Sequence, residues 1–302
     1  MTVAAPASVG DALRAAARRL RASGSRSPRL DAELLLANAL DCPRAELFRE
    51  PARVLEAEEA ARFEGLLVRR EAREPVAYIL GFRAFRTIDV EVTPAVLIPR
   101  ADTETLVDVA LEALAAIPLA GPGPEGEPLA LDVGTGSGCV ALALATEDPF
   151  VRVVATDVDS ATLAVARRNA ARLGLQRRVE FVLSDLFADL GERAFDLIVS
   201  NPPYIPAHEY EALEPNVRDY EPRLALFGGE DGLDVYRRLI PGAALLLRAG
   251  GTLALEVGAG QARDVAAIIR ASGAYEAPDA RSDLAGIPRV VYARRRGARD
   301  KG

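Results

Sequence analysis

The stretch that decides the fold is Leu131-Asp132-Val133-Gly134-Thr135-Gly136-Ser137-Gly138, in which an apolar run meets three alternating glycines. Glycine lets the chain turn tightly and lets a ligand approach the backbone closely. The turn joins an expected strand over Leu129–Val133 to an expected helix over Cys139–Thr146, so a ligand would lie over the strand's carboxyl end. The spacing is G-x-G-x-G and not the dinucleotide pattern G-x-G-x-x-G. A turn that only connects strand to helix is the alternative.

The alternation of strand and helix continues downstream of this turn. Short apolar runs predict strands at Leu129–Val133, Val151–Thr156, Val179–Leu183, Phe195–Ser200 and Thr252–Val257. Helical periodicity predicts helices at Cys139–Thr146, Ser160–Leu173, Leu233–Leu247 and Gln261–Ser272. Two late strand candidates, near Tyr275–Ala277 and Arg289–Ala293, are expected to pair as an antiparallel edge. This order predicts an α/β fold with a mainly parallel sheet covered on both faces.

The part of the chain before the glycine turn has a different character. Residues 1–80 are rich in Ala, Leu, Arg and Glu, with apolar residues at helical spacing, as in a small helical bundle. The stretch Phe82–Val92 alternates and predicts a short strand pair, and Asp102 is expected to cap the next helix. We therefore expect a helical domain at 1–80, a β-hairpin linker at 81–100 and an α/β domain at 101–302.

The composition narrows the class of partner. The 302 residues carry a formal net charge of −7, whereas proteins that bind phosphate backbones usually have a basic surplus, so direct nucleic-acid binding is not expected. No window approaches eighteen consecutive apolar residues, so we expect no membrane span. One histidine, His208, and two distant cysteines, Cys42 and Cys139, cannot build a closed zinc site, so no metal is expected. The cysteines are typical of buried thiols in a reducing compartment, which favours a cytoplasmic protein. A monomer is expected.

Two carboxylates follow the next two predicted strands. Asp157 ends the second strand, where a carboxylate can accept hydrogen bonds from both ribose hydroxyls of a nucleoside. Nicotinamide dinucleotides and S-adenosylmethionine would both use this feature. A simple helix N-cap is the alternative for Asp157, although Asp159 or Ser160 could fill that role. After the third strand, Asp185 can meet an adenine amino group while Leu186 lines the ring.

The segment Ser200-Asn201-Pro202-Pro203-Tyr204 ends the fourth predicted strand. Two prolines fix φ and remove two backbone donors. The Asn201 side-chain oxygen and the Pro202 carbonyl are then two fixed acceptors, which match the two hydrogens of an NH2 group. Tyr204 can stack on a planar acceptor. We therefore expect Asn201, Pro202 and Tyr204 to act on a planar amino group of an amide, adenine or cytosine. A rigid turn after a buried strand is the alternative.

No strong base lies near this segment in the sequence. His208 is close, but a lone histidine in a loop is more often incidental. The economical mechanism is therefore positioning, in which the two acceptors hold the nitrogen in line with the methyl donor and favour positive charge on the NH2 group.

At this point the chain resembles the glutamine-N5 methyltransferases that act on bacterial peptide chain release factors. The resemblance covers nearly the whole chain. The motifs that carry it are Leu97-Ile98-Pro99-Arg100, Asp102-Thr103-Glu104, Asp132 to Gly138, Ser184 to Phe187, Asn201 to Tyr204, Tyr220-Glu221-Pro222, Gly228 to Tyr236, and Leu255-Glu256-Val257-Gly258 with Gln261. Asn-Pro-Pro-Tyr alone is shared with adenine-N6 DNA methyltransferases and several RNA methyltransferases, whereas the helical N-terminal domain with Leu-Ile-Pro-Arg is more specific.

The resemblance implies a five-helix domain that binds the partner, a hairpin linker and a seven-stranded, Rossmann-like class I methyltransferase domain. It implies S-adenosylmethionine as methyl donor, S-adenosylhomocysteine as product and the glutamine of a Gly-Gly-Gln loop in the release factor as acceptor. The residues expected at the cofactor are Gly134, Thr135, Gly136, Ser137, Gly138, Asp157, Asp185, Leu186 and Asn201. Those expected at the glutamine are Asn201, Pro202, Pro203 and Tyr204. Some members carry tryptophan at the position of Leu186, so adenine packing is expected to be looser here.

Four alternatives stay open on the residues alone. A sibling enzyme could methylate a glutamine of a ribosomal protein, and a more distant one could methylate an amino group of a nucleic acid, against which the net acidity counts. A nicotinamide oxidoreductase could use the same glycine turn, but no catalytic tyrosine–lysine pair is visible. A cofactor-binding module without catalysis is the fourth alternative.

Overall fold

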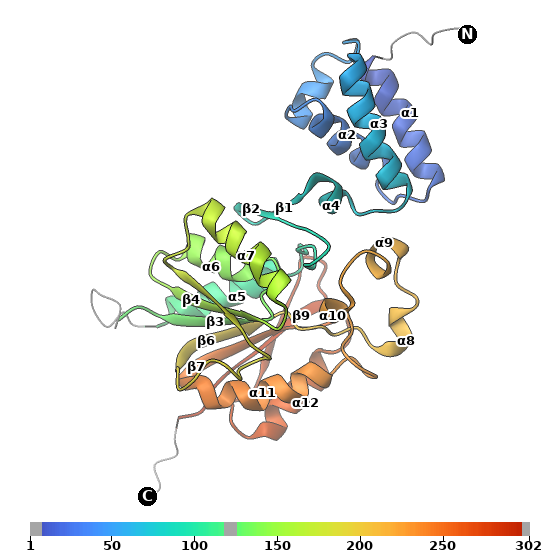
Figure 1. Ribbon diagram of the computed structural model, residues 1–302. Coiled ribbons are helices and arrows are strands. Elements are labelled where there is room, and N and C mark those ends of the chain that lie inside the picture. Colours follow the sequence, from blue (N-terminus) through green and yellow to red (C-terminus); the bar gives the residue numbers. More distant parts are fainter. Residues whose placement is uncertain (1–7, 118–125, 298–302) are drawn as a thin grey trace, which may run out of the picture. The chain divides into compact units, whose positions relative to one another are not determined.

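The computed structural model describes residues 8–117 and 126–297, which form two compact units. The first unit contains the chain up to Phe82 together with Glu214–Tyr220, and the second contains Arg83–Leu213 and the chain from Glu221 onward (Figure 1). No helix in these described ranges is both long enough and apolar enough to cross a membrane.

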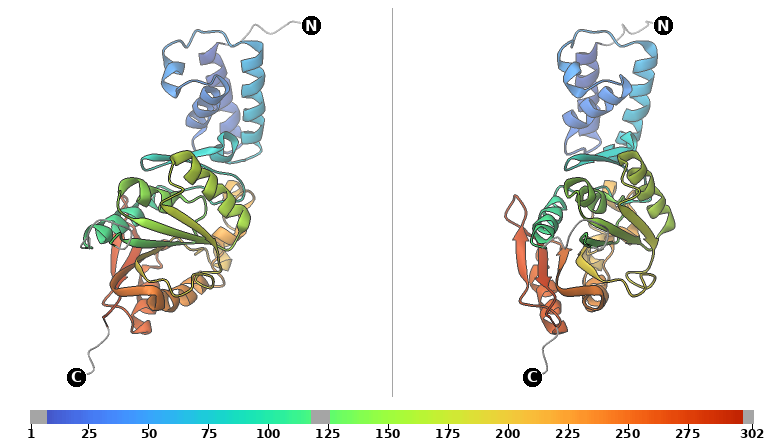
Figure 2. Two further views of the ribbon diagram at one scale, coloured as in Figure 1. Left: turned by 60° about the vertical axis from the view of Figure 1, so that its left-hand side comes forward. Right: turned by 90° about the vertical axis from the view of Figure 1, so that its left-hand side faces the viewer.

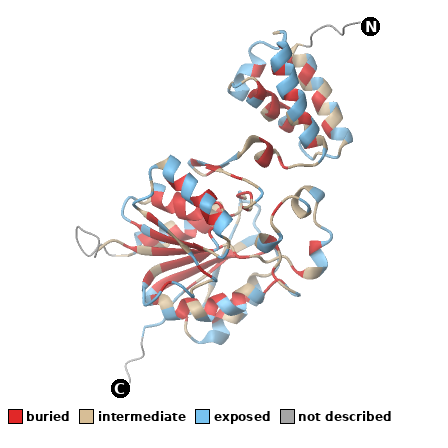
Figure 3. Ribbon diagram, viewed as in Figure 1, coloured by how far each residue is buried: buried red, intermediate tan, exposed pale blue. Residues whose placement is uncertain are grey.

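The first unit is built from helices that bury one face each. Its elements are α1 (Val9–Ala22), α2 (Pro28–Ala39), the 3-10 helix η1 (Arg44–Phe48), α3 (Ala57–Glu71), α4 (Val76–Leu80) and α9 (Pro215–Arg218). Ser8 caps α1 by accepting a hydrogen bond from the Asp11 amide, and Leu20, Leu35 and Leu36 are fully buried in the core. Figure 3 shows buried positions alternating with exposed ones along α1 to α3, as amphipathic helices require.

The segment Glu214–Tyr220 comes late in the sequence but belongs to this first unit. The Tyr220 hydroxyl donates to the Ala72 carbonyl at 2.6 Å, and Arg26 forms an ion pair with Glu214. The residues directly after it, from Glu221, belong to the second unit. The chain therefore runs without a break from the helical unit into the segment of the α/β unit that begins at Glu221.

The second unit contains a seven-stranded sheet in the order β5-β4-β3-β6-β7-β9-β8. The strands are β3 (Leu129–Val133), β4 (Arg152–Asp157), β5 (Val179–Leu183), β6 (Phe195–Ser200), β7 (Leu247–Glu256), β8 (Asp279–Ser282) and β9 (Pro288–Arg294). The first five strands in this order are parallel to one another, and β9 is antiparallel to both of its neighbours. A separate hairpin pairs β1 (Phe82–Phe85) with β2 (Ile88–Glu91).

Helices cover both faces of this sheet. Figure 1 shows α5 (Glu104–Ala115), α6 (Cys139–Glu147) and α7 (Ser160–Leu173) on one face, with α11 (Asp234–Leu246) and α12 (Ala262–Ser272) on the other. Figure 2 shows the same layers from two further sides. The short helices α8 (Ala207–Tyr210) and α10 (Arg223–Leu226) lie in the connection between β6 and α11. The central parallel strands β3 and β6 are largely buried on both faces, as their apolar runs require. The expected α/β architecture with an N-terminal helical part is confirmed.

Two local expectations were wrong. The two late strands pair as the expected antiparallel edge of the sheet, and β9 covers the expected Arg289–Ala293, but its partner β8 lies at Asp279–Ser282 and not at Tyr275–Ala277. Asp102 was expected to cap α5, but Thr103 is its N-cap residue and Asp102 forms an ion pair with Arg289 at 3.0 Å.

Candidate functional site

A cavity of about 380 Å³ opens where the parallel strands end. Its walls come from the residues that follow β3, β4, β5 and β6, from the segment Ala95–Thr103 before α5, and from Pro222, Leu224 and Ala225 around α10. Ligands in open α/β sheets bind outside the carboxyl ends of the strands, and cavities of this size hold small organic molecules. The geometry therefore makes this the candidate site.

Most of the residues predicted from the sequence meet here. The lining includes Gly134, Thr135, Gly136, Ser137, Asp157, Asp185, Leu186, Asn201, Pro202 and Pro203. Of the predicted residues in the described chain, Gly138 and Tyr204 are not in this lining. Gly138 is the N-cap residue of α6, and a Cβ there would lie 3.1 Å from Leu142 and 3.3 Å from Ala166. Its role in the structure is close packing between α6 and α7.

The glycine turn leaves open space above its backbone. Gly134 and Gly136 have φ of 71° and 58°, which favours glycine, and a Cβ at either position would meet no atom within 4 Å. The Ser137 hydroxyl is buried and has no hydrogen-bond partner in the described chain. The turn therefore offers a bare backbone and an unused hydroxyl to a ligand.

Asp157 is held by the glycine turn that it faces. Its carboxylate accepts from the Gly136 amide at 3.0 Å and from the Asp159 amide at 3.1 Å, and burial raises its pKa. Asp159 is the N-cap residue of α7 and accepts from the Ala161 amide at 2.8 Å. The capping role therefore belongs to Asp159. Each Asp157 oxygen carries a further lone pair, so the carboxylate can still accept two hydroxyl donors.

The end of β5 supplies one charged and one strained residue. Asp185 forms an ion pair with Arg238 at 2.7 Å, and both side chains are more than half exposed. Leu186 has φ of 55°, which is unusual for a residue with a side chain. The strain fits a position where the surrounding structure fixes the side chain for a purpose. Leu186 lines the cavity and also packs against the core below it.

Asn201 is oriented by a residue that the sequence did not single out as functional. Its side-chain NH2 group donates to the Thr103 hydroxyl oxygen at 3.2 Å. Because the donor end of the amide is engaged, its oxygen is the end left for a ligand. One residue earlier, the Ser200 hydroxyl donates to the Val133 carbonyl at 2.7 Å and ties the end of β6 to the glycine turn.

The backbone after Asn201 is tightly supported. Gln261 donates to the Tyr204 carbonyl at 2.9 Å, and a Cβ on Gly228 would lie 2.7 Å from the Pro203 carbonyl oxygen. The Tyr204 ring packs against the core, and burial raises its pKa to about 12. The stacking role expected for Tyr204 stays a prediction. His208 is exposed on α8 and is not among the lining residues of the described chain.

Two of the motifs that carry the resemblance form one wall of the cavity. Glu221 is buried and accepts from the Ile98 amide at 3.1 Å and from Arg100 at 2.5 Å. The Leu-Ile-Pro-Arg and Tyr-Glu-Pro segments are therefore joined through one carboxylate. Arg100 lines the cavity and brings a positive charge to it.

Asp132 is a further site residue that the sequence analysis did not assign. It lines the cavity with 1% exposure and accepts from the Thr135 hydroxyl at 2.6 Å and the Ala141 amide at 3.2 Å. Burial raises its pKa to about 6, which the hydrogen bond from Thr135 opposes. The signal was present, since Asp132 lies within the glycine-rich stretch.

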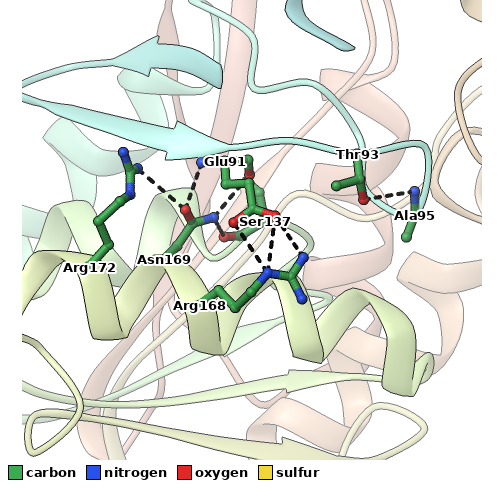
Figure 4. A network of polar contacts seen from close by, with 7 residues as sticks. All are labelled: Glu91, Thr93, Ala95, Ser137, Arg168, Asn169 and Arg172. Carbon is green, nitrogen blue, oxygen red and sulfur yellow. Dashed lines mark hydrogen bonds and ion pairs between the residues drawn. The ribbon is translucent and has the colours of Figure 1, made fainter. Parts of the chain in front are cut away.

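A fully buried asparagine connects the hairpin to the glycine turn (Figure 4). Asn169 on α7 donates to the Ser137 carbonyl at 2.9 Å and to the Glu91 carbonyl at 3.0 Å, and it accepts from the Glu91 amide at 2.6 Å. The Glu91 carboxylate in turn pairs with Arg168 at 2.7 Å. The amide uses both of its N–H donors and its oxygen, so it fixes the back of the glycine turn.

Two families of protein domains match this chain. Residues 11–81 match the PrmC N-terminal domain family, and residues 119–218 match the methyltransferase small domain family. The catalytic domain of hMettl16 in complex with the MAT2A 3'UTR hairpin 1 is 18% identical, covering 82% of this chain and 85% of that chain, with a TM-score of 0.53. That likeness shows a shared fold.

Full-length relatives are much closer. The release factor glutamine methyltransferase of Moorella thermoacetica is 46% identical over 94% of this chain and 98% of its own length. The enzyme of the same name from Geobacter sulfurreducens is 46% identical over 91% of this chain and 92% of its own. Since both relatives match along almost their whole length, the chain belongs to the release factor glutamine methyltransferase family.

Proposed function

We propose that this protein transfers a methyl group from S-adenosylmethionine to the side-chain amide nitrogen of a glutamine in a peptide chain release factor. The observation that carries the chemistry is the oriented Asn201 amide, whose NH2 group is held by Thr103. Its oxygen is then available to accept from a substrate NH2 group. The choice of a release factor rests on the names of the close relatives.

The donor set of the cavity fits S-adenosylmethionine. The Asp157 carboxylate, partly buried and held by two backbone amides, suits the two ribose hydroxyls. The bare turn at Gly134 and Gly136 gives room for the amino-acid part, and the unpartnered Ser137 hydroxyl adds one polar contact. Leu186 supplies an apolar surface for a planar base.

In this proposal the protein acts by orientation. Bound S-adenosylmethionine supplies an electrophilic methyl group. An amide nitrogen is a weak nucleophile because its lone pair is delocalised. Asn201 and the Pro202 carbonyl hold the nitrogen in place and stabilise positive charge on the NH2 group as the new bond forms. Orientation of this kind can contribute about 7–11 kcal/mol. The proton leaves to water after transfer.

The proposal gives the helical unit the task of binding the release factor. Supporting this, the unit contains none of the residues that line the cavity among those described, yet it includes Glu214–Tyr220, which continues directly into the cavity wall at Pro222. Both cysteines are free thiols, which agrees with a reducing cytoplasm.

The test is to incubate the protein with methyl-labelled S-adenosylmethionine and, separately, with a release factor, ribosomal proteins, RNA and DNA. Peptide mass spectrometry should place the label on the glutamine of the Gly-Gly-Gln loop. Label on ribosomal protein or nucleic acid, with none on the release factor, contradicts the proposal.

Asn201→Ala tests the mechanism within the same assay. Loss of one preorganised dipole slows turnover by about two to three decades in comparable sites, equivalent to about 2.7–4 kcal/mol. Affinity for S-adenosylmethionine should stay nearly intact. Gln176→Ala is the matched control, because Gln176 is an exposed side-chain amide on the α/β unit and is not among the described residues that line the cavity. Transfer by Asn201→Ala at close to the wild-type rate would show that the segment is only a turn.

A further inference from the structure

Thr103 uses its hydroxyl in an unusual way for a helix N-cap residue. Threonine at this position normally caps with its side-chain oxygen, but Thr103 makes no side-chain capping hydrogen bond to α5. Instead its oxygen accepts from the Asn201 NH2 group at 3.2 Å. Thr103 is only 2% exposed, so the hydroxyl proton also needs a partner inside the protein.

The acceptor that lies close to this hydroxyl is the Glu256 carboxylate, whose pKa is lowered by its hydrogen-bonding interaction with Thr103. Glu256 is the last residue of β7, and the register pairs Ser200 of β6 with Leu255 of β7. Asn201 and Glu256 are the residues that follow this pair, so they lie side by side at the ends of neighbouring strands. The Tyr236 hydroxyl fixes the Glu256 backbone by donating to its carbonyl at 2.7 Å.

Glu256 is an exceptional group to bury. It is 1% exposed, and within the described chain its Oε2 atom has no hydrogen-bond partner. A buried carboxylate that is not fully paired is expensive to keep. It is not among the described residues that line the cavity.

We propose that Glu256 and Thr103 are positioning residues that decide which end of the Asn201 amide faces the substrate. This inference rests on the proposed function. When Glu256 is a carboxylate, it accepts a hydrogen bond from the Thr103 hydroxyl. The Thr103 oxygen can then only accept a hydrogen bond from the Asn201 NH2 group. The Asn201 oxygen is thereby presented to the glutamine.

When Glu256 is protonated, the order of hydrogen bonds can reverse. The carboxylic acid donates to Thr103, Thr103 donates to the Asn201 oxygen, and the NH2 group of Asn201 turns toward the cavity. Both arrangements satisfy the hydroxyl, so reversal does not cost a hydrogen bond at Thr103. An NH2 group facing a substrate NH2 group cannot accept from it, so this form should be inactive.

The protonation of Glu256 changes in an accessible pH range. Burial raises its pKa to about 7, while the hydrogen bond from Thr103 and the charge of Arg289 act in the opposite direction. The other titratable or charged groups that act on Glu256, or on which it acts, are Asp102, Arg100, Tyr204, Tyr236 and Cys139. The rate of methyl transfer should therefore fall as the pH decreases through about 7.

The experiment is single-turnover methyl transfer to a release factor across about pH 6 to 9, at saturating S-adenosylmethionine. Saturation removes effects on cofactor binding, including those from Asp132. Wild-type transfer should be about tenfold slower at pH 6 than on the plateau, as expected for one ionisation near 7. Glu256→Gln cannot ionise and should lose this acid limb.

Two variants of Thr103 complete the test. Thr103→Val deletes the hydroxyl at nearly constant shape and should slow transfer about tenfold or more, with cofactor affinity within about threefold of wild type. Thr103→Ser restores the hydroxyl and should recover both most of the rate and the acid limb. Wild-type rates in Thr103→Val, or an unchanged acid limb in Glu256→Gln, would overturn the inference. Absence of any glutamine methylation by the wild-type protein contradicts the proposed function instead.

Discussion

Replacing Asn169 should damage the fold and the site together, because this amide bonds three backbone groups from the hairpin and the glycine turn. It is 0% exposed and bonds the Ser137 carbonyl, the Glu91 carbonyl and the Glu91 amide (Figure 4). Asn169→Leu keeps the size and removes all three bonds. Each buried group left unpaired costs about 1–3 kcal/mol, and Glu91 is only partly buried, so we expect a total loss of about 3–5 kcal/mol.

Asn169→Asp keeps the acceptor oxygen of the side chain and removes its two N–H donors. The new carboxyl can still accept from the Glu91 amide, but in its ionised form it faces the carbonyls of Ser137 and Glu91 with a second acceptor. Its folded-state pKa should therefore lie above the unfolded value. The stability of this variant is then greatest below the unfolded pKa and is lost as the pH rises through the folded one, so its deficit against wild type should grow between about pH 5 and pH 8.

Thermal unfolding of the full chain provides the first measurement. A loss of about 3–5 kcal/mol in a unit of this size lowers Tm by roughly 6–20 °C. The second measurement is affinity for S-adenosylmethionine, which should fall in both variants because the Ser137 carbonyl anchors the glycine turn. Asn38→Asp on the exposed surface is the control and should change Tm little. A shift of less than about 3 °C in Asn169→Leu would refute the reasoning.

Three further outcomes follow from single contacts. Asp157→Ala should weaken S-adenosylmethionine binding by about 1.5–3 kcal/mol in calorimetry, and unchanged affinity in a folded variant removes Asp157 from the site. Gly228→Ala should slow methyl transfer about tenfold or more and leave cofactor affinity unchanged, because the added Cβ would lie 2.7 Å from the Pro203 carbonyl oxygen. An unchanged rate would mean that this loop adjusts freely. Glu256→Gln should be the more stable protein at about pH 8. Burial raises the pKa of Glu256 from 4.5 to about 7, so the wild type loses about 3 kcal/mol as the pH rises over that interval and the variant does not; equal pH profiles of Tm would contradict this.

The sheet was predictable where burial dictates composition. β3 and β6 begin and end at the expected residues, because a parallel strand buried on both faces is a continuous apolar run. β8 was not predictable in this way. Its residues, Asp279–Ser282, are mostly exposed and include no apolar run, since the strand lies at an edge and is held by its hydrogen bonds to β9.

The part of the candidate site that lines the cavity was predictable for a related reason. The glycine turn, Asp157 and Asn201 each follow a recognisable strand, and the carboxyl ends of parallel strands meet at one edge of the sheet. The residues that support this part were not predictable. Thr103 is 98 positions from Asn201, and Glu221 is 121 positions from Arg100, so no local pattern joins them.

The chemistry of the network nevertheless explains why threonine lies where it does. Asn201 must keep its oxygen for the substrate, so its NH2 group needs an acceptor inside the protein. Glu256 ends the neighbouring strand β7 and, as a carboxylate, can only accept hydrogen bonds. A group between the two must accept on one side and donate on the other, which a hydroxyl does with one atom. Thr103 at the start of α5 supplies that hydroxyl. Its side chain does not cap α5, and its oxygen accepts a hydrogen bond from Asn201 instead.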